Sequence, residues 1–392
     1  MPASPFNLSL PAELTQAELA HCTELVGNSR WSAVQAKESA RRGSAIILAF
    51  ASHIQAPWLL GASAAMHNMP LVVAGLGTPG GWPWYYGATP KLPASRRAAQ
   101  LLRALTPAQP VALVDSFDVL VANHPPLEVR TVLTQLGDDE VIVGGECTMF
   151  PRCRAEELRA LPSWRTCYAE GHNACSPNGG FILGRPYALQ RLLDAMMGLL
   201  AAPPGNEPPA ERFTSRHDQG ALQQLLIAGG AGVRLIIDSA SRLVLNLHAC
   251  AARWNRTHLI KGFAKCHERW HVPLSTVEVP NASALLHWPR GRSAGRRRRP
   301  AEPVITRRRS STHNADASYG GGAVRPLLLH ANGNHPLLRH PTIRPIVESF
   351  NFSEASMADW PPRVLEAPVL LVDSVQHGLC AVVTLRSLMT RQ

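Results

Sequence analysis

Short apolar runs alternate with amphipathic segments between residues 44 and 226, and this alternation limits the folds that the chain can adopt. Residues 44–50 are almost entirely apolar, as in strands that lie inside a parallel sheet. Residues 57–68 predict an amphipathic helix, and residues 70–75 predict the next strand. Further strands are expected at residues 111–114, 140–143 and 181–184, and further helices at residues 96–105, 126–136, 187–200 and 219–226. The pattern predicts a doubly wound α/β fold, with a central, mostly parallel sheet flanked by helices.

Two aspartates follow the predicted strand at residues 111–114, in the segment Asp115-Ser116-Phe117-Asp118. Carboxylates held a few Å apart repel one another and resist desolvation unless a cation lies between them. Oxygen ligands suit Mg²⁺ or Mn²⁺, and those ions suit a diphosphate. The two aspartates therefore indicate a nucleotide-dependent enzyme. The alternative is that they serve only as helix N-caps or in loop turns.

Two loops are expected at the same edge of the sheet, where open α/β sheets bind their ligands. Ser52 follows the first strand, and a loop rich in Gly, Pro and Trp covers residues 75–84. Trp82 and Trp84 could each supply a flat surface on which a base stacks, or could cover the edge of the core. Ser52 is a candidate donor-binding residue because of its position.

The formal charge of +11 would favour nucleic acid or an anionic membrane as a partner if it were spread along the chain. It is concentrated instead, because residues 289–326 hold ten arginines against two acidic residues, a net +8. Burial cannot offset the ordering entropy of this segment, which has almost no large apolar side chain, so we expect a disordered insertion. Nucleic acid is therefore not the expected partner, and an RNA-associated function carried by residues 290–309 is the alternative.

The expected organisation has three parts. An N-terminal extension covers residues 1–43, a folded domain that contains the insertion covers residues 44–350, and a C-terminal extension covers residues 351–392. In this last part, residues 368–372 and 381–385 predict short strands, to which no chemistry is assigned.

Eight cysteines are present, and none are spaced as CxxC, so a zinc site is not expected. Four of them fall close together: Cys147, Cys153, Cys167 and Cys175. They suit one or two loop disulfides in an oxidising compartment, and free thiols are the alternative. No N-terminal run has the apolar core of a signal peptide, and no apolar run reaches the length of a membrane span.

Several segments, in the same order, resemble the glycosyltransferase domain of the procollagen lysyl hydroxylases, which also occurs as a stand-alone domain. The matching segments are residues 111–121, 146–151, 177–184, 217–219, 238–247 and 328–334. The resemblance implies a GT-A fold, a Rossmann-like arrangement, and a UDP-sugar donor, either UDP-glucose or UDP-galactose. It also implies Mn²⁺, or Mg²⁺, held by Asp115, Asp118 and His330, and an endoplasmic reticulum or Golgi location. The acceptor would be a hydroxyl group on a protein or glycan, such as hydroxylysine or galactosyl-hydroxylysine.

The resemblance also assigns roles around the donor. Together with Ser52, which is selected by its position, the donor-binding residues would be Trp82, Lys91, Asn178, Gly179, Gly180, Gln219, Asn332 and Gly333. Asp218 would be the catalytic carboxylate near the transferred sugar, and its alternative role is that of an ordinary acidic residue at a helix N-terminus. Lys91 could equally be solvated, and residues 178–180 could form a simple strand-entry turn. Asp238 and Asn246 match as well, and either could serve a structural role at a strand end.

The chain departs from the family pattern near the acceptor. Phe150 stands where the family has a tryptophan, and Arg216 and His217 replace part of an aspartate run. The family's lysine shortly after His330 is missing, and the basic insertion enters just before that histidine. These changes leave open a catalytically weak UDP-sugar or glycan-binding domain. Whether transfer retains or inverts configuration is open as well, because no residue is identified as the general base.

Overall fold

The computed structural model describes thirteen parts of the chain. They are residues 13–32, 34–35, 43–51, 58–78, 88–116, 119–122, 125–146, 154–170, 174–201, 218–230, 232–246, 327–330 and 360–390. The arginine-rich segment 289–326 lies outside them.

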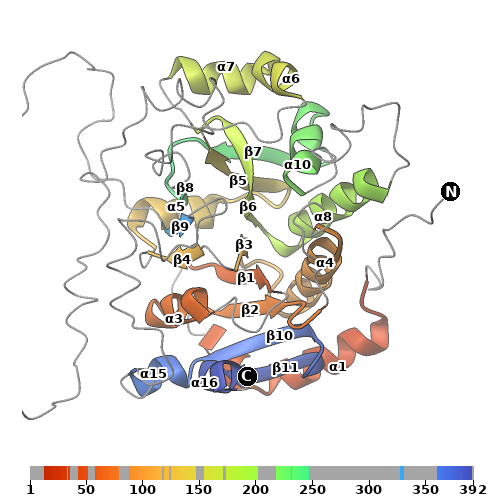
Figure 1. The fold of residues 1–392 in the computed structure, drawn as a ribbon, viewed down its shortest axis with the longest axis vertical. Helices are drawn as coiled ribbons and strands as arrows, with labels where there is room; N and C mark the ends of the chain where they lie inside the picture. The colour runs from red at the N-terminus through yellow and green to blue at the C-terminus, as the bar shows by residue number, and fades with distance from the viewer. Residues whose placement is uncertain are drawn as a thin grey trace, which may run out of the picture.

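The described parts form a mixed sheet of eight strands with helices on both faces, which is an α/β fold (Figure 1). In spatial order its strands are β11 (Gly378–Thr384), β10 (Pro368–Ser374), β2 (Leu71–Ala74), β1 (Ile46–Phe50), β3 (Val111–Asp115), β6 (Ser176–Gly184), β5 (Glu140–Glu146) and β7 (Arg234–Asp238). The run β10-β2-β1-β3 is parallel throughout, and β5 is parallel to β7. The mostly parallel sheet expected from the sequence is therefore present.

One strand direction differs from the simple doubly wound pattern. β6 is antiparallel to both of its neighbours, β3 and β5. Its apolar run and the helix that follows read the same in the sequence whichever way the strand points. The reversal brings residues 178–180, in the first half of β6, beside the end of β3.

A second, smaller sheet packs on one face of the large one. It contains β4 (Val119–Val121), β9 (Leu328–His330) and β8 (Val244–Asn246), in that order. β9 is antiparallel to β4 and parallel to β8. The last of these three strands in the sequence, β9, thus lies between the two earlier ones.

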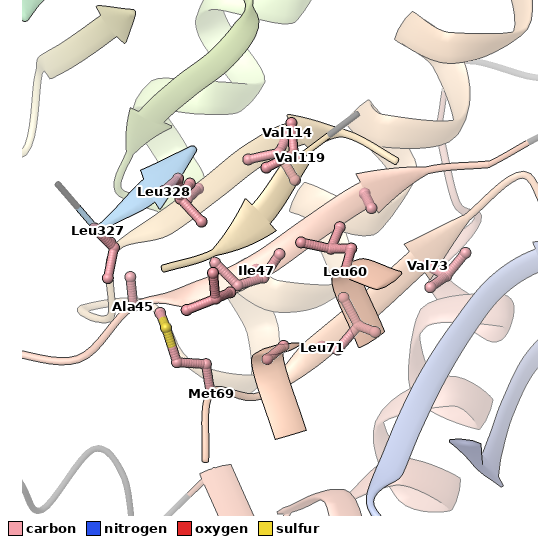
Figure 2. Packing of buried hydrophobic residues seen from close by; sticks show 14 of the residues in the cluster. Ala45, Ile47, Leu60, Met69, Leu71, Val73, Val114, Val119, Leu327 and Leu328 are labelled. Carbon is pink, nitrogen blue, oxygen red and sulfur yellow. The ribbon is translucent and has the colours of Figure 1, made fainter. Parts of the chain in front are cut away.

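Alternate side chains of the central strands enter two separate cores. On β1, Ile47 and Ala49 face a core shared with the small sheet and helix α3 (Trp58–Met66), whereas Ile46 and Leu48 face the other core. Figure 2 shows the first core, where Ile47, Leu60 and Leu328 come from β1, α3 and β9. Both faces of the sheet are therefore covered, as expected for a sheet with continuously apolar strands.

The remaining helices cover the edges and faces of this sheet. They are α1 (Gln16–Gly27), α4 (Ala88–Leu105), α5 (Leu127–Gln135), α6 (Ala155–Ala160), α7 (Pro162–Ala169), α8 (Pro186–Ala201), α10 (Asp218–Ile227), α15 (Pro362–Leu365) and α16 (Leu385–Thr390). α4 and α8 lie side by side on the core opposite the small sheet (Figure 1). Among the described residues, no helix has both the length and the apolar character that crossing a membrane requires.

The two ends of the described chain join the central fold. The strands expected at residues 368–372 and 381–385 are present as β10 and β11, and β10 pairs with β2. Helix α1 is tied to β11 by a disulfide between Cys22 and Cys380, which the sequence did not predict. A second disulfide joins Cys167 to Cys175, within the cysteine-rich stretch where loop disulfides were expected. Cys147 and Cys153 lie outside the described residues.

Candidate functional site

The candidate site lies at the carboxyl end of β3, where the large sheet meets the small one. Asp115 is the last residue of β3 and pairs in register with Phe50, the last residue of β1. Because β6 is antiparallel to β3 and places Phe181 opposite Val114, Gly180 comes next to Asp115. The carboxylate therefore leaves the apolar core at the edge where α/β sheets bind ligands.

His330 faces Asp115 from the small sheet. Its Nε2 atom lies 3.8 Å from Asp115 Oδ2, and its side chain is only 1% exposed, against 38% for that of Asp115. His330 is the last residue of β9 and pairs in register with Val119 of β4. Residues separated by more than two hundred positions in the sequence thus meet through strand pairing.

Gly180 packs against both of these side chains. A Cβ atom added there would overlap His330 Cε1 and lie 2.8 Å from Asp115 Oδ2. A side chain at this position would displace the imidazole from the carboxylate. The glycine is therefore required for the close approach of β6 to the two polar groups.

Lys91 lies between two carboxylates from different elements. Its Nζ atom, on α4, donates to Asp115 Oδ1 at 2.7 Å and to Asp218 Oδ2 at 2.6 Å. Burial alone would lower the pKa of Lys91, but the attraction of Asp115 and of Asp218 outweighs burial and raises the pKa above its ordinary value. The lysine is buried rather than solvated, and it stays charged at physiological pH.

Asp218 is the first residue of α10 and has two roles. One carboxylate oxygen, Oδ1, accepts from the backbone N–H of Gln219 at 2.8 Å, as an acidic residue at a helix N-terminus does. The other, Oδ2, binds Lys91. The helix start thereby aims one oxygen into the site, so the structural and the candidate functional roles coexist in one side chain.

Glu146 and two amides form a buried network beside the glycines. Asn178 Nδ2 donates to Glu146 Oε2 at 3.0 Å, and Gln219 Nε2 donates to Glu146 Oε1. Asn178 Oδ1 accepts from the N–H of Gly180 at 2.8 Å, and Gln219 Oε1 accepts from the N–H of Gly179 at 3.3 Å. Sequence reasoning did not select Glu146 as a site residue, although it begins one of the segments that carry the resemblance. The network fixes the backbone of the two glycines.

Asn246 lies directly behind His330. Its Oδ1 atom is 2.6 Å from His330 Nδ1, and its Nδ2 atom donates to the carbonyl oxygen of Gly145 at 2.7 Å. The side chain is largely buried, at 8% exposed. Asn246 was left open between a role in the site and a structural role at a strand end, and the structure shows it in contact with His330 of the site.

Asp238, by contrast, has the structural role that was the alternative for it. Its carboxylate accepts from the backbone N–H groups of Arg242, Leu243 and Val244 and so closes the turn between β7 and β8. Burial raises the pKa of Asp238, and the three backbone donors oppose the rise. The acid shapes the turn that leads to Asn246.

Several residues considered from the sequence lie outside the described parts: Ser52, Trp82, Trp84, Asp118, Phe150, Arg216, His217, Asn332 and Gly333. Val119, which follows Asp118 in the chain, is the register partner of His330. Among the described residues, no group of three or more His, Cys, Asp or Glu side chains is arranged to hold a metal ion.

The described pair of Asp115 and His330 nevertheless fits a divalent ion. A separation of 3.8 Å allows one ion at about 2.1 Å from each atom to contact both. A carboxylate oxygen suits Mn²⁺ and Mg²⁺ alike, whereas Mg²⁺ has less use for the imidazole nitrogen. The donor set therefore favours Mn²⁺ over Mg²⁺.

Comparison with known proteins adds no family assignment. A scan against known protein families and a search of curated proteins each find no match to the chain.

Proposed function

We propose that this chain is a metal-dependent hexosyltransferase with a GT-A fold, which moves glucose or galactose from a UDP-sugar to a hydroxyl group on a protein or glycan. One observation carries the proposal: Asp115, Lys91 and His330, from β3, α4 and β9, converge at the carboxyl edge of an α/β sheet. The resemblance to the procollagen lysyl hydroxylase glycosyltransferase domain supplies the reaction class. The acceptor it suggests is hydroxylysine or galactosyl-hydroxylysine.

The proposed metal ligands are Asp115, Asp118 and His330, with Mn²⁺ as the ion. Asp118 joins the set because its chain neighbour Val119 pairs with His330 across the small sheet. When bound, the ion would act as a Lewis acid on the leaving diphosphate.

The other groups would bind and orient the donor. The ammonium of Lys91 is placed to meet a diphosphate oxygen, because it already binds two carboxylates at this edge. The carboxylate of Asp218 would accept from sugar hydroxyl groups, which would align the anomeric carbon with the acceptor. Gly179 and Gly180 let the main chain approach the sugar, and the Glu146 network holds them in place.

The disulfides favour an oxidising compartment, such as the lumen suggested by the resemblance. Cys22–Cys380 and Cys167–Cys175 are both formed in the described part of the chain. Such bonds persist in secreted and lumenal proteins and are rare in the cytosol.

The test measures UDP released from UDP-glucose and from UDP-galactose, with Mn²⁺ and with a chelator. We expect Mn²⁺-dependent release from at least one donor, with a loss of about 100-fold or more in Asp115→Asn and His330→Ala, since each removes a ligand. Asp194→Asn is the control, because this aspartate pairs with Arg96 on the far side of α4.

Two outcomes would redirect the proposal. If the parent chain binds UDP-Mn²⁺ tightly but releases no UDP with any donor or acceptor, the domain recognises sugar nucleotides or glycans without turnover. If Asp115→Asn, Asp118→Ala and His330→Ala all bind UDP-Mn²⁺ as tightly as the parent, the site assignment is wrong.

A further inference from the structure

The contact between Asn246 and His330 has a direction that the amide itself determines. Asn246 Nδ2 donates to the carbonyl of Gly145 at 2.7 Å, and the reverse orientation would place two oxygen atoms against each other. The amide oxygen therefore faces His330 Nδ1, at 2.6 Å. An amide oxygen only accepts, so Nδ1 must carry the proton.

We infer that Asn246 is a positioning residue that selects the Nδ1–H tautomer of His330. A neutral imidazole has one proton, so a proton on Nδ1 leaves a lone pair on Nε2. Nε2 is the atom that lies 3.8 Å from Asp115. The amide of Asn246 thus leaves the nitrogen that faces the carboxylate, Nε2, unprotonated and able to bind a metal ion.

Strand pairing holds the amide and the imidazole in this arrangement. Asn246 and His330 are register partners in the parallel pair β8 and β9, so their side chains leave the small sheet on the same face. The hydrogen bond to Gly145 ties the amide to β5 of the large sheet as well. Groups that orient a histidine ligand through its second nitrogen typically change metal affinity by about 10–100-fold when they are removed.

A purely structural role predicts a different mutant pattern. If Asn246 only joined the two sheets, then every variant that loses the bond to Gly145 would behave alike. Asn246→Asp loses that donor but keeps an oxygen facing Nδ1, whereas Asn246→Ala loses both. The aspartate variant therefore separates ring orientation from sheet attachment.

The experiment records the tautomer of His330 by nitrogen NMR of the full-length, metal-free chain with labelled histidine, using His330→Gln to assign the signals. We expect the parent and Asn246→Asp to hold the Nδ1–H tautomer and Asn246→Ala to show a mixture. Gln109→Ala is the control, because it removes a buried amide that bonds Gln35 and Ser44 near the start of β3, at the opposite end of that strand from Asp115. The affinity for Mn²⁺ in the presence of UDP is measured on the same variants, and Asn246→Ala is expected to lose about 10–100-fold.

The tautomer measured by NMR does not depend on the proposed function. The expected change in Mn²⁺ affinity does rest on it. An unchanged tautomer in Asn246→Ala would overturn the positioning role, and so would a Mn²⁺ affinity that falls equally in Asn246→Asp and Asn246→Ala. If the parent chain binds no Mn²⁺ with UDP while the tautomer still depends on Asn246, the proposed function fails and the tautomer assignment holds.

Discussion

Two of the buried cations on helix α4, Arg97 and Lys91, are used differently. The Nε–H group of Arg97 is shared between both carboxylate oxygens of Asp373 in β10, and the two side chains are 4% and 5% exposed. Lys91, less than two turns earlier, is shared by Asp115 and Asp218, which are 38% and 21% exposed. One cation is enclosed with its partner, whereas the other faces carboxylates that remain open to solvent.

This difference in exposure determines which of the two ion pairs a ligand can disrupt. The planar guanidinium of Arg97 matches a carboxylate geometrically and holds a helix to a strand. The ammonium of Lys91 is a point charge on a flexible stem, and another cation can approach its partly exposed carboxylate partners. The first pair therefore belongs to stability and the second to the candidate site.

The largest expected effect comes from breaking the enclosed pair. Arg97→Met would lower the free energy of unfolding by about 3–5 kcal/mol, because Asp373 would be left buried without its cation. Lys91→Met on the same helix would cost about 1 kcal/mol or less, because water can reach its partners. Urea unfolding monitored by circular dichroism measures both. Equal losses in the two variants would contradict the division between a structural and an exchangeable pair.

The next effect sharpens the comparison within the site, which is open at Asp115 but tightly packed at Gly180. Gly180→Ala would displace the His330 ring, lowering the affinity for UDP-Mn²⁺ by about 10–100-fold and the stability by about 1–3 kcal/mol. Isothermal titration calorimetry, in which UDP is added to the protein in the presence of Mn²⁺, measures the affinity.

Gly198→Ala supplies the matched control for that substitution. No atom lies within 4 Å of a Cβ built on Gly198, which is inside α8. This variant should bind normally and gain about 0.5–1 kcal/mol in stability, since alanine favours helix. Normal binding by Gly180→Ala would show that the imidazole need not lie where the structure places it.

The sequence was sufficient to predict the parts of the fold that depend on local pattern. The short apolar runs predicted β1, β2 and β3 by their length and composition, and residues 57–68 contain the expected helix as α3, which carries no charged residue and is apolar rather than amphipathic. The direction of β6 is not encoded in this way, because a strand has the same period in both directions. The disulfide between Cys22 and Cys380 joins residues 358 positions apart, and spacing alone could not pair them.

For the candidate site, the chemistry was more predictable than the contacts. Asp115 could be selected because a carboxylate after a buried strand needs a reason to be there. Lys91 and Asp218 were selected as well, but the bond between them was not foreseen, because they are 127 residues apart and meet only when α4 and α10 pack on the same edge. The same holds for Asn246, whose contact with His330 depends on the register of two short strands.

The smallest effect we predict changes sign with the ligand. Lys91→Met should raise the affinity for Mn²⁺ alone, because the ammonium no longer competes for Asp115, and should lower the affinity for UDP in the presence of Mn²⁺, because a diphosphate contact is lost. Each change is expected to be about tenfold, or about 1.4 kcal/mol, since Asp115 is partly hydrated. Titration with Mn²⁺ alone, and then with UDP at saturating Mn²⁺, separates the two.

Arg103→Met is the control on the same helix, because Arg103 lies over the ring of Tyr187 and should leave both affinities unchanged. Opposite shifts in Lys91→Met would mean that the lysine exchanges one partner for another as ligands arrive. A fall in both affinities would mean that Lys91 holds Asp115 in place, as Arg97 holds Asp373. Lys91 and Arg97 would then both be structural, and the contrast between them would be lost.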